Sequence, residues 1–164
     1  MPPAKNWNCI AHAGKRAARS QFFYFWPVIR KRNSKLMMVV NVRVKDSAIH
    51  GLGCFADQPI AKGQLVWTFD DRIDLRIPVE RVPGLPQPAR DFLDMYAFQE
   101  VKDGKTYLIL CGDHGKHMNH SEQPNTTEES NGDNRAARDI AAGEELTCNY
   151  FLFDAGAAAR IGRP

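Results

Sequence analysis

The residues best equipped for chemistry lie in three short segments of the chain. The first, residues 47–56, has Gly-Leu-Gly at its centre, and backbone without a Cβ atom can approach a ligand closely. The second, residues 118–125, reads Met-Asn-His-Ser-Glu-Gln-Pro-Asn, and its asparagine amides can both donate and accept hydrogen bonds. The third, residues 138–150, ends in Glu-Glu-Leu-Thr-Cys-Asn-Tyr. Taken alone, Gly-x-Gly is weak evidence, because it lacks the third glycine and the following helix of a dinucleotide-binding motif.

A metal site is one chemistry to test, because His114, His117 and His120 follow one another at intervals of three residues. On a helix this spacing would place the imidazoles on one face, where they could share an ion. Gly115 and Pro124 instead favour irregular backbone in this region. We therefore expect no metal.

The charges of the chain divide into two unlike parts. Of 22 Lys and Arg residues, eight lie in residues 1–36, where there is no acid. From Met37 onward, 14 basic residues face 19 acidic ones, a net charge of −5 that the whole-chain value of +3 conceals. Such a domain suits a basic protein segment as its partner. Nucleic acid is expected as a partner only through the basic leader, residues 1–36, if at all.

The cysteines and the apolar runs indicate the cellular compartment in which the protein is expected. Four cysteines are widely scattered without CxxC spacing, which argues against a zinc module or a disulfide scaffold: Cys9, Cys54, Cys111 and Cys148. We expect a reducing environment and a cytoplasmic location. The longest apolar run, residues 22–29, contains Pro27 and is far shorter than the roughly 17–25 residues that span a bilayer. We therefore expect no membrane partner.

The elements that must position these segments are mostly strands. Residues 38–45 alternate, with Val40, Val42 and Val44 on one face, which predicts a half-buried strand. Short strands are predicted at 54–56 and within the apolar run 65–69.

The middle of the chain predicts a loop, a helix and a hairpin in turn. Residues 70–90 are rich in Asp, Arg and Pro and are expected to be loop-like, whereas Pro88 can open a helix that runs through Phe98. Asp103-Gly104 separates two β-prone segments, 96–101 and 106–110, and so predicts a hairpin, which competes with the helix for residues 96–98. Bends are expected at Asn131-Gly132 and Ala142-Gly143. The pattern indicates a mostly β fold with one short helix.

The three segments, in this order, resemble the SET domain, a family of S-adenosylmethionine-dependent protein lysine methyltransferases. The resemblance covers residues 40–150, and its most specific motifs are Asn-His-Ser-x-x-Pro-Asn and Gly-Glu-Glu-Leu-Thr-x-x-Tyr. It implies a β-clip-like arrangement of short sheets with a C-terminal pseudoknot, in which the segment of Asn119 is threaded beneath the final loop. It also implies a structural role for the acidic Glu145.

The resemblance further implies a function and its residues. The expected reaction is transfer of a methyl group from S-adenosylmethionine to the ε-amine of a protein lysine, with Tyr150 as the catalytic residue. The expected cofactor-binding residues are Gly51, Leu52, Gly53, Asn119 and His120. Four aromatic residues are candidates for a substrate channel: Phe69, Tyr96, Tyr107 and Phe151. For Tyr96 and Tyr107 a plain core role is the more common alternative for an aromatic residue on a strand. The alternative is a catalytically inactive SET-fold module that binds a peptide or partner protein.

The sequence also departs from the family pattern. Asn149 stands where Asp is common, and no cysteine follows Cys148, so a zinc-binding post-SET module is not expected. The divisions that we expect are a leader at residues 1–36, disordered or outside the native product, a SET domain at 37–154 and a tail at 155–164. This resembles a minimal domain of the bacterial or viral kind, whose product state and oligomeric state the sequence leaves open.

Overall fold

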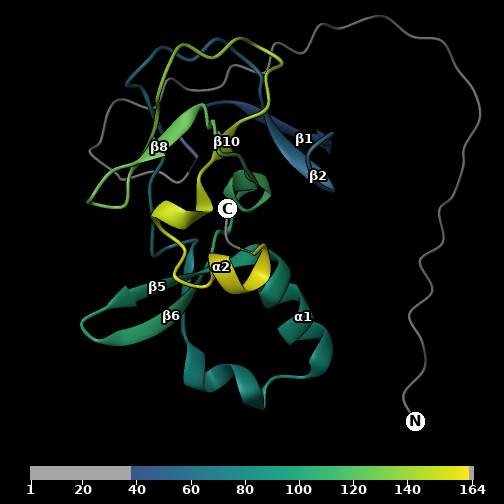
Figure 1. Cartoon of the computed structure of the whole chain (residues 1–164), viewed down its shortest axis with the longest axis vertical. Helices are drawn as coiled ribbons and strands as arrows, with labels where there is room; N and C mark the ends of the chain where they lie inside the picture. The colour runs from purple at the N-terminus through teal and green to yellow at the C-terminus, as the bar shows by residue number, and fades with distance from the viewer. Residues whose placement is uncertain (1–37, 163–164) are drawn as a thin grey trace, which may run out of the picture. The chain divides into compact units, whose positions relative to one another are not determined.

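The computed structural model describes residues 38–162. The leader predicted at residues 1–36 therefore lies outside the described residues. The described part is built of short strands with two α-helices and three 3-10 helices (Figure 1). Among these residues, no helix has both the length and the apolar character that crossing a membrane requires.

The first hairpin joins β1 (Val42–Asp46) to β2 (Leu52–Ala56). The two strands run antiparallel, with Val44 opposite Cys54. Val40 is buried just before β1, and the valines at 42 and 44 are half-buried while their neighbours are exposed. The predicted alternation is confirmed, because one face of this hairpin packs on the main core and the other meets water.

A three-stranded sheet has the order β3-β9-β8, formed by β3 (Leu65–Trp67), β8 (Thr126–Glu128) and β9 (Asn134–Ala136). Strands β8 and β9 are a hairpin whose turn contains Gly132 at φ +84°, so the bend predicted at Asn131-Gly132 is present. The sequence did not predict the two strands that flank this bend, because their residues are mainly polar.

A second sheet has the order β4-β6-β5, formed by β4 (Leu75–Pro78), β5 (Ala97–Lys102) and β6 (Lys105–Leu110). Asp103 and Gly104 turn between β5 and β6 with φ of 51° and 71°, the two positive values that a type I′ hairpin turn requires. This hairpin confirms the prediction. Strand β4 corrects the expectation of a loop over residues 70–90, because pairing with β6 makes those four residues extended.

Helix α1 (Gln87–Tyr96) follows the 3-10 helix η1 (Val79–Gly84) and has a proline in its first turn. It ends at Tyr96, and Ala97 already belongs to β5, which settles the competition between helix and strand at this boundary. Leu93 is the buried residue of α1 and packs with Ala97 and Leu108 in a small core of its own.

The C-terminal motif joins two distant parts of the chain. Strand β7 (Asn119–His120) follows the 3-10 helix η2 (His114–His117), and it pairs in parallel with β10 (Thr147–Cys148). The residues just before β10 pair with β2 as well, since Leu146 N donates to Cys54 O at 2.7 Å. The segment 144–148 thus contacts β2 and β7 together, as the expected pseudoknot requires.

After β10 the chain continues into η3 (Tyr150–Leu152) and the short helix α2 (Ala157–Arg160). Figure 1 shows α2 beside α1, and Arg160 Nη1 donates to the carbonyl of Asp94 in α1 at 3.3 Å. Ala157 is only 1% exposed. Of the tail predicted at residues 155–164, the described part, 155–162, therefore packs against the predicted domain.

Candidate functional site

A cavity of about 540 Å³ lies where the C-terminal motif meets β7, β5 and α1. Its lining comes from segments far apart in the sequence, among them Asn119 and His120 of β7, Cys148 of β10, and Tyr150 and Phe151 of η3. A volume of this size is typical of small-molecule and cofactor sites, which span about 300–1,000 Å³.

Asn119 ties the loop after β1 to the C-terminal motif. It is 7% exposed, and its Nδ2 donates to the carbonyls of His50 at 3.1 Å and Leu52 at 3.2 Å, and to Glu145 Oε1 at 2.8 Å. Within the described residues, no hydrogen bond reaches its Oδ1 atom. Because Asn119 also lines the cavity, this oxygen is an acceptor left for a ligand that carries a donor.

Glu145 is the acceptor on which these segments converge. In addition to Asn119, it accepts hydrogen bonds from Ser47 Oγ at 2.8 Å and 2.9 Å. A Cβ atom at residue 53 would lie 2.3 Å from Glu145 Oε1, so any other residue there would have to displace this carboxylate. The group that the backbone at Gly53 approaches closely is therefore the carboxylate of Glu145. The structural role implied for Glu145 agrees with these contacts.

The remaining predicted cofactor residues lie beside the cavity rather than in its lining. Gly51 adopts φ +46° and Leu52 is 43% exposed, and neither lines the cavity. Ile49 and His50, immediately before them, do line it. The turn thus presents its first residues to the cavity, and Asn119 holds it there through the carbonyls of His50 and Leu52.

Tyr150 is fixed at both ends in the cavity wall. Its hydroxyl donates to the carbonyl of Met118 at 2.8 Å, and its backbone N–H donates to His120 Nδ1 at 3.2 Å. Burial, as the main cause, raises the pKa of the Tyr150 phenol well above its usual range, so the hydroxyl keeps its proton at neutral pH. The imidazole of His120 also packs edge-on against Phe151. The predicted residues Asn119, His120 and Tyr150 therefore meet at one cavity.

Two of the four candidate channel residues line this cavity and two do not. Tyr96, at the end of α1, and Phe151, in η3, belong to the lining. Phe69 instead lies under the guanidinium of Arg76, 4.5 Å from its ring centre, and Tyr107 lies on the middle strand β6 between Pro78 and Glu100. The pairing of β4 with β6, which the sequence did not predict, places Tyr107 in the middle of that sheet, and the contact with Arg76 accounts for Phe69.

The structure adds Phe98 and Glu128, which the sequence did not assign to the site, and it also places Phe153 there. Phe98 and Phe153 both line the cavity and pack edge-to-face, with ring centroids 5.0 Å apart. Glu128, at the end of β8, also lines it. The apolar run Phe-Leu-Phe directly after Tyr150 is the sequence's candidate for covering the channel, and its last residue is Phe153. Glu128 was not predicted, because it lies in a polar, turn-rich part of the sequence.

The residues after η3 are anchored over this region by an ion pair. Asp154 is buried, and its Oδ1 accepts hydrogen bonds from the backbone N–H groups of Gln99 and Gly156, both at 2.9 Å. Its other oxygen pairs with Arg160, whose Nη1 also donates to the carbonyl of Ala97 at 2.5 Å. Both residues of this pair line the cavity, so the pair forms part of its wall.

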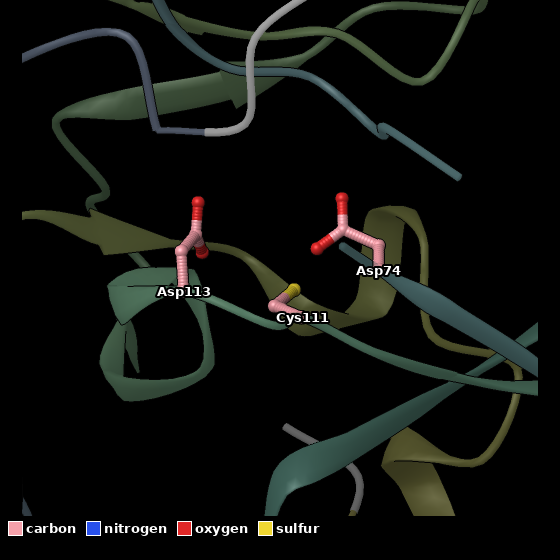
Figure 2. Close-up of side chains that lie close together, drawn as sticks. All are labelled: Asp74, Cys111 and Asp113. Carbon is pink, nitrogen blue, oxygen red and sulfur yellow. The ribbon is translucent and has the colours of Figure 1, made fainter. Parts of the chain in front are cut away.

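One cluster of possible metal ligands lies in the described part of the chain. Asp74, Cys111 and Asp113 each bring a ligand atom within 4.8 Å of the other two, and Figure 2 shows the Cys111 thiol between the two carboxyl groups. Both carboxylates already hold backbone: Asp74 accepts from the N–H groups of Asp70 and Gly112, and Asp113 accepts from those of Gly115 and Met38. These bonds account for the two acids as structural groups.

A comparison with known protein families shows to which family this chain belongs. The family model for the SET domain matches residues 51–151, which include all the segments that form the cavity wall around β7 and β10. The chain belongs to the SET domain family. No curated protein sequence matches it significantly.

Solved SET-domain structures resemble this SET domain. A crystal structure of a candidate histone methyltransferase from Plasmodium falciparum is 25% identical, with a TM-score of 0.50, and the match covers 68% of this chain and 93% of that one. Polycomb Repressive Complex 2 of Chaetomium thermophilum, bound to the inhibitor GSK126, contains a chain 20% identical, with a TM-score of 0.56. That match covers 74% of this chain but 17% of the other, and it supports the fold alone.

Proposed function

We propose that this SET domain transfers a methyl group from S-adenosylmethionine to the ε-amine of a lysine in a protein. The observation that carries the proposal is the meeting of Asn119, His120 and Tyr150 at one cavity, through pairing of β7 with β10 and the bond of Tyr150 N–H to His120. Membership of the SET domain family supports the same chemistry. The Plasmodium protein, named as a candidate histone methyltransferase, is consistent with it.

The residues of the cavity fit the proposed cofactor. The free Oδ1 of Asn119 is an acceptor for an amine, and His50 lies next to it on the cavity wall. When bound, the cofactor supplies an electrophilic methyl group on a sulfonium, so the chain needs no nucleophile of its own. The role of these residues is to bind, to orient and to exclude water.

Lysine must react as a neutral amine, and the cavity favours that form. With a pKa near 10.4, a free lysine lies about 4.6 kcal/mol from its neutral form at pH 7. The aromatic rings of Tyr96, Phe98 and Phe153 line the cavity and disfavour a charged ammonium by desolvation. The Tyr150 hydroxyl donates to Met118, which leaves its oxygen free to accept a hydrogen bond from an amine.

The partner that we propose is a lysine in a basic protein segment. Exposed carboxylates of Asp94 and Glu122 line the cavity, and the chain from Met37 onward carries a net charge of −5. A histone-tail peptide is therefore a suitable probe, since its cationic flanks would meet acidic groups at the rim.

Calorimetry with S-adenosylmethionine and methyl transfer to a histone-tail peptide test the proposal together. The wild type should bind the cofactor, and Tyr150→Phe should bind it equally while turnover falls by at least tenfold. Asn119→Ala should lose cofactor binding. A folded wild type that binds no cofactor would rule out the enzyme and leave the inactive binding module. Unchanged turnover in Tyr150→Phe would remove this residue from catalysis.

A further inference from the structure

Glu128 is a carboxyl group without a partner in the wall of the cavity. It is the last residue of β8 and partly buried, and in the described part of the chain its side chain makes no hydrogen bond or ion pair. The acid on the other side of the same cavity, Asp154, is by contrast fully engaged by Gln99, Gly156 and Arg160. The Glu128 oxygens are not among the fully buried polar atoms without a partner, so water reaches them, and a donor that enters the cavity can take the place of that water.

The direction of the side chain follows from the strand. Thr126 lies two residues earlier on β8, and its hydroxyl donates to the carbonyl of Thr147 in β10 at 2.8 Å. Alternate residues of a strand share a face, so Glu128 lies on the same face as Thr126, toward β10. Cys148 of β10 and Tyr150 line the cavity there together with Glu128.

The charged groups that shift the pKa of Glu128 are both acids. The charged side chains that act on it are Glu100 from β5 and Asp133 from the turn between β8 and β9. Cys148 from β10 and Tyr150 from η3 are kept neutral by burial. Burial first, and then the two acids, raise the pKa of Glu128 to about 7. The cations nearby have other acidic partners: Arg160, which lines the same cavity, pairs with Asp154, while Glu100 and Asp133 pair with Arg76 and Arg135. Lys116 also lines the cavity. A carboxyl group with this pKa is well matched to proton transfer near neutral pH.

We propose that Glu128 is the base that receives the proton of the substrate lysine. The lysine ammonium enters the cavity and pairs with the Glu128 carboxylate. An N–H bond then breaks and an O–H bond forms, while the electron pair remains on the nitrogen, which is now a neutral amine. The ion pair becomes a neutral pair, which a desolvated cavity favours. Between turnovers the carboxyl group returns the proton to water. This inference rests on the proposed function.

The pH profile of kcat/KM distinguishes this base from a lysine that loses its proton to water before binding. With Glu128 as the base, kcat/KM for a histone-tail peptide should rise about tenfold per pH unit up to about pH 7 and then be level to pH 9. In Glu128→Gln it should be at least tenfold lower at pH 7 and should still rise toward pH 9. Glu129→Gln removes the neighbouring exposed carboxylate, which pairs with Arg135 outside the cavity, and should retain the wild-type profile.

Two outcomes would overturn the inference, and they differ. If the wild type and Glu128→Gln are both active with parallel profiles, Glu128 is not the base, while the proposed methyl transfer stands. If the wild type transfers no methyl group at any pH, the proposed function fails and this inference fails with it. Calorimetry with S-adenosylmethionine serves as the fold control, because Glu128→Gln should bind the cofactor as the wild type does.

Discussion

The side-chain amide of Asn119 donates a hydrogen bond to Glu145 Oε1 across 2.8 Å. The two residues belong to different motifs, and the same carboxylate also accepts from Ser47 Oγ, 98 positions earlier in the chain. A single acid therefore holds together the turn after β1, the strand β7 and the C-terminal motif. The position of the cavity wall depends on these hydrogen bonds to Glu145, although Glu145 itself does not line the cavity.

Replacement of Glu145 by alanine should destabilise the protein. The change leaves Ser47 Oγ and Asn119 Nδ2 without their charged acceptor, and we expect the free energy of unfolding to fall by about 2–4 kcal/mol. Urea denaturation measures this fall. Glu129→Ala is the control, because its pair with Arg135 is partly exposed, at 43% and 33% of the two side chains, and should contribute less than about 1 kcal/mol. Equal losses of unfolding free energy in the two variants would show that Glu145 does not hold these three segments together.

Gly53 and Gly51 should respond differently to alanine. A Cβ atom at residue 53 would meet Glu145 Oε1 at 2.3 Å, so we expect Gly53→Ala to displace that side chain and cost about 2–3 kcal/mol. At residue 51 nothing lies within 4 Å of the added atom, and only the positive φ of 46° opposes it, at about 1–2 kcal/mol. Urea denaturation of both variants, each combined with Glu145→Ala, separates the causes: only the cost of Gly53→Ala should shrink.

Local chemistry was sufficient to predict much of the fold. The residues of β1, with their alternating valines, and of the Asp103-Gly104 turn determine the local structure by themselves, and both elements were predicted. Strand β4 was not, because Leu75–Pro78 becomes extended through pairing with β6, a contact absent from its own pattern.

The site shows the same division between local and distant causes. Asn119, His120 and Tyr150 were recognised by motif, and the structure brings them together. Glu128 was not recognised, because its neighbours in sequence indicate an exposed turn. Contacts with the C-terminal motif, among them the bond between Thr126 and Thr147 across 21 positions, turn that strand face toward the cavity.

Loss of the Arg160 guanidinium should loosen the C-terminal segment. Asp154 would remain buried with its charge unpaired, and breaking such a pair from one side costs about 3–5 kcal/mol when both groups are buried. Because the Arg160 side chain is 24% exposed, we expect Arg160→Ala to cost about 2–3 kcal/mol. Amide hydrogen exchange should quicken at residues 155–162 and at Gln99, whose N–H is bound by Asp154.

The control for Arg160 is an exposed ion pair of the same kind. Arg138 is 56% exposed and pairs with Glu144, and its replacement by alanine should change the stability by less than about 1 kcal/mol. Similar exchange rates at residues 155–162 in the wild type and in Arg160→Ala would contradict the anchoring role of this pair.

Glu128 should also make the stability of the protein depend on pH. Its pKa is about 7 in the folded protein against 4.5 for the free group, so between these values the folded state binds more protons than the unfolded state. Stability from this group is therefore lost as the pH rises from 4.5 to 7, by roughly 1–3 kcal/mol in total. Glu128→Gln lacks this loss. We expect urea denaturation to find the variant more stable than the wild type at pH 8, with the difference shrinking toward pH 4.5. A difference that stays constant across this range would mean that Glu128 ionises as freely in the folded protein as in the unfolded chain.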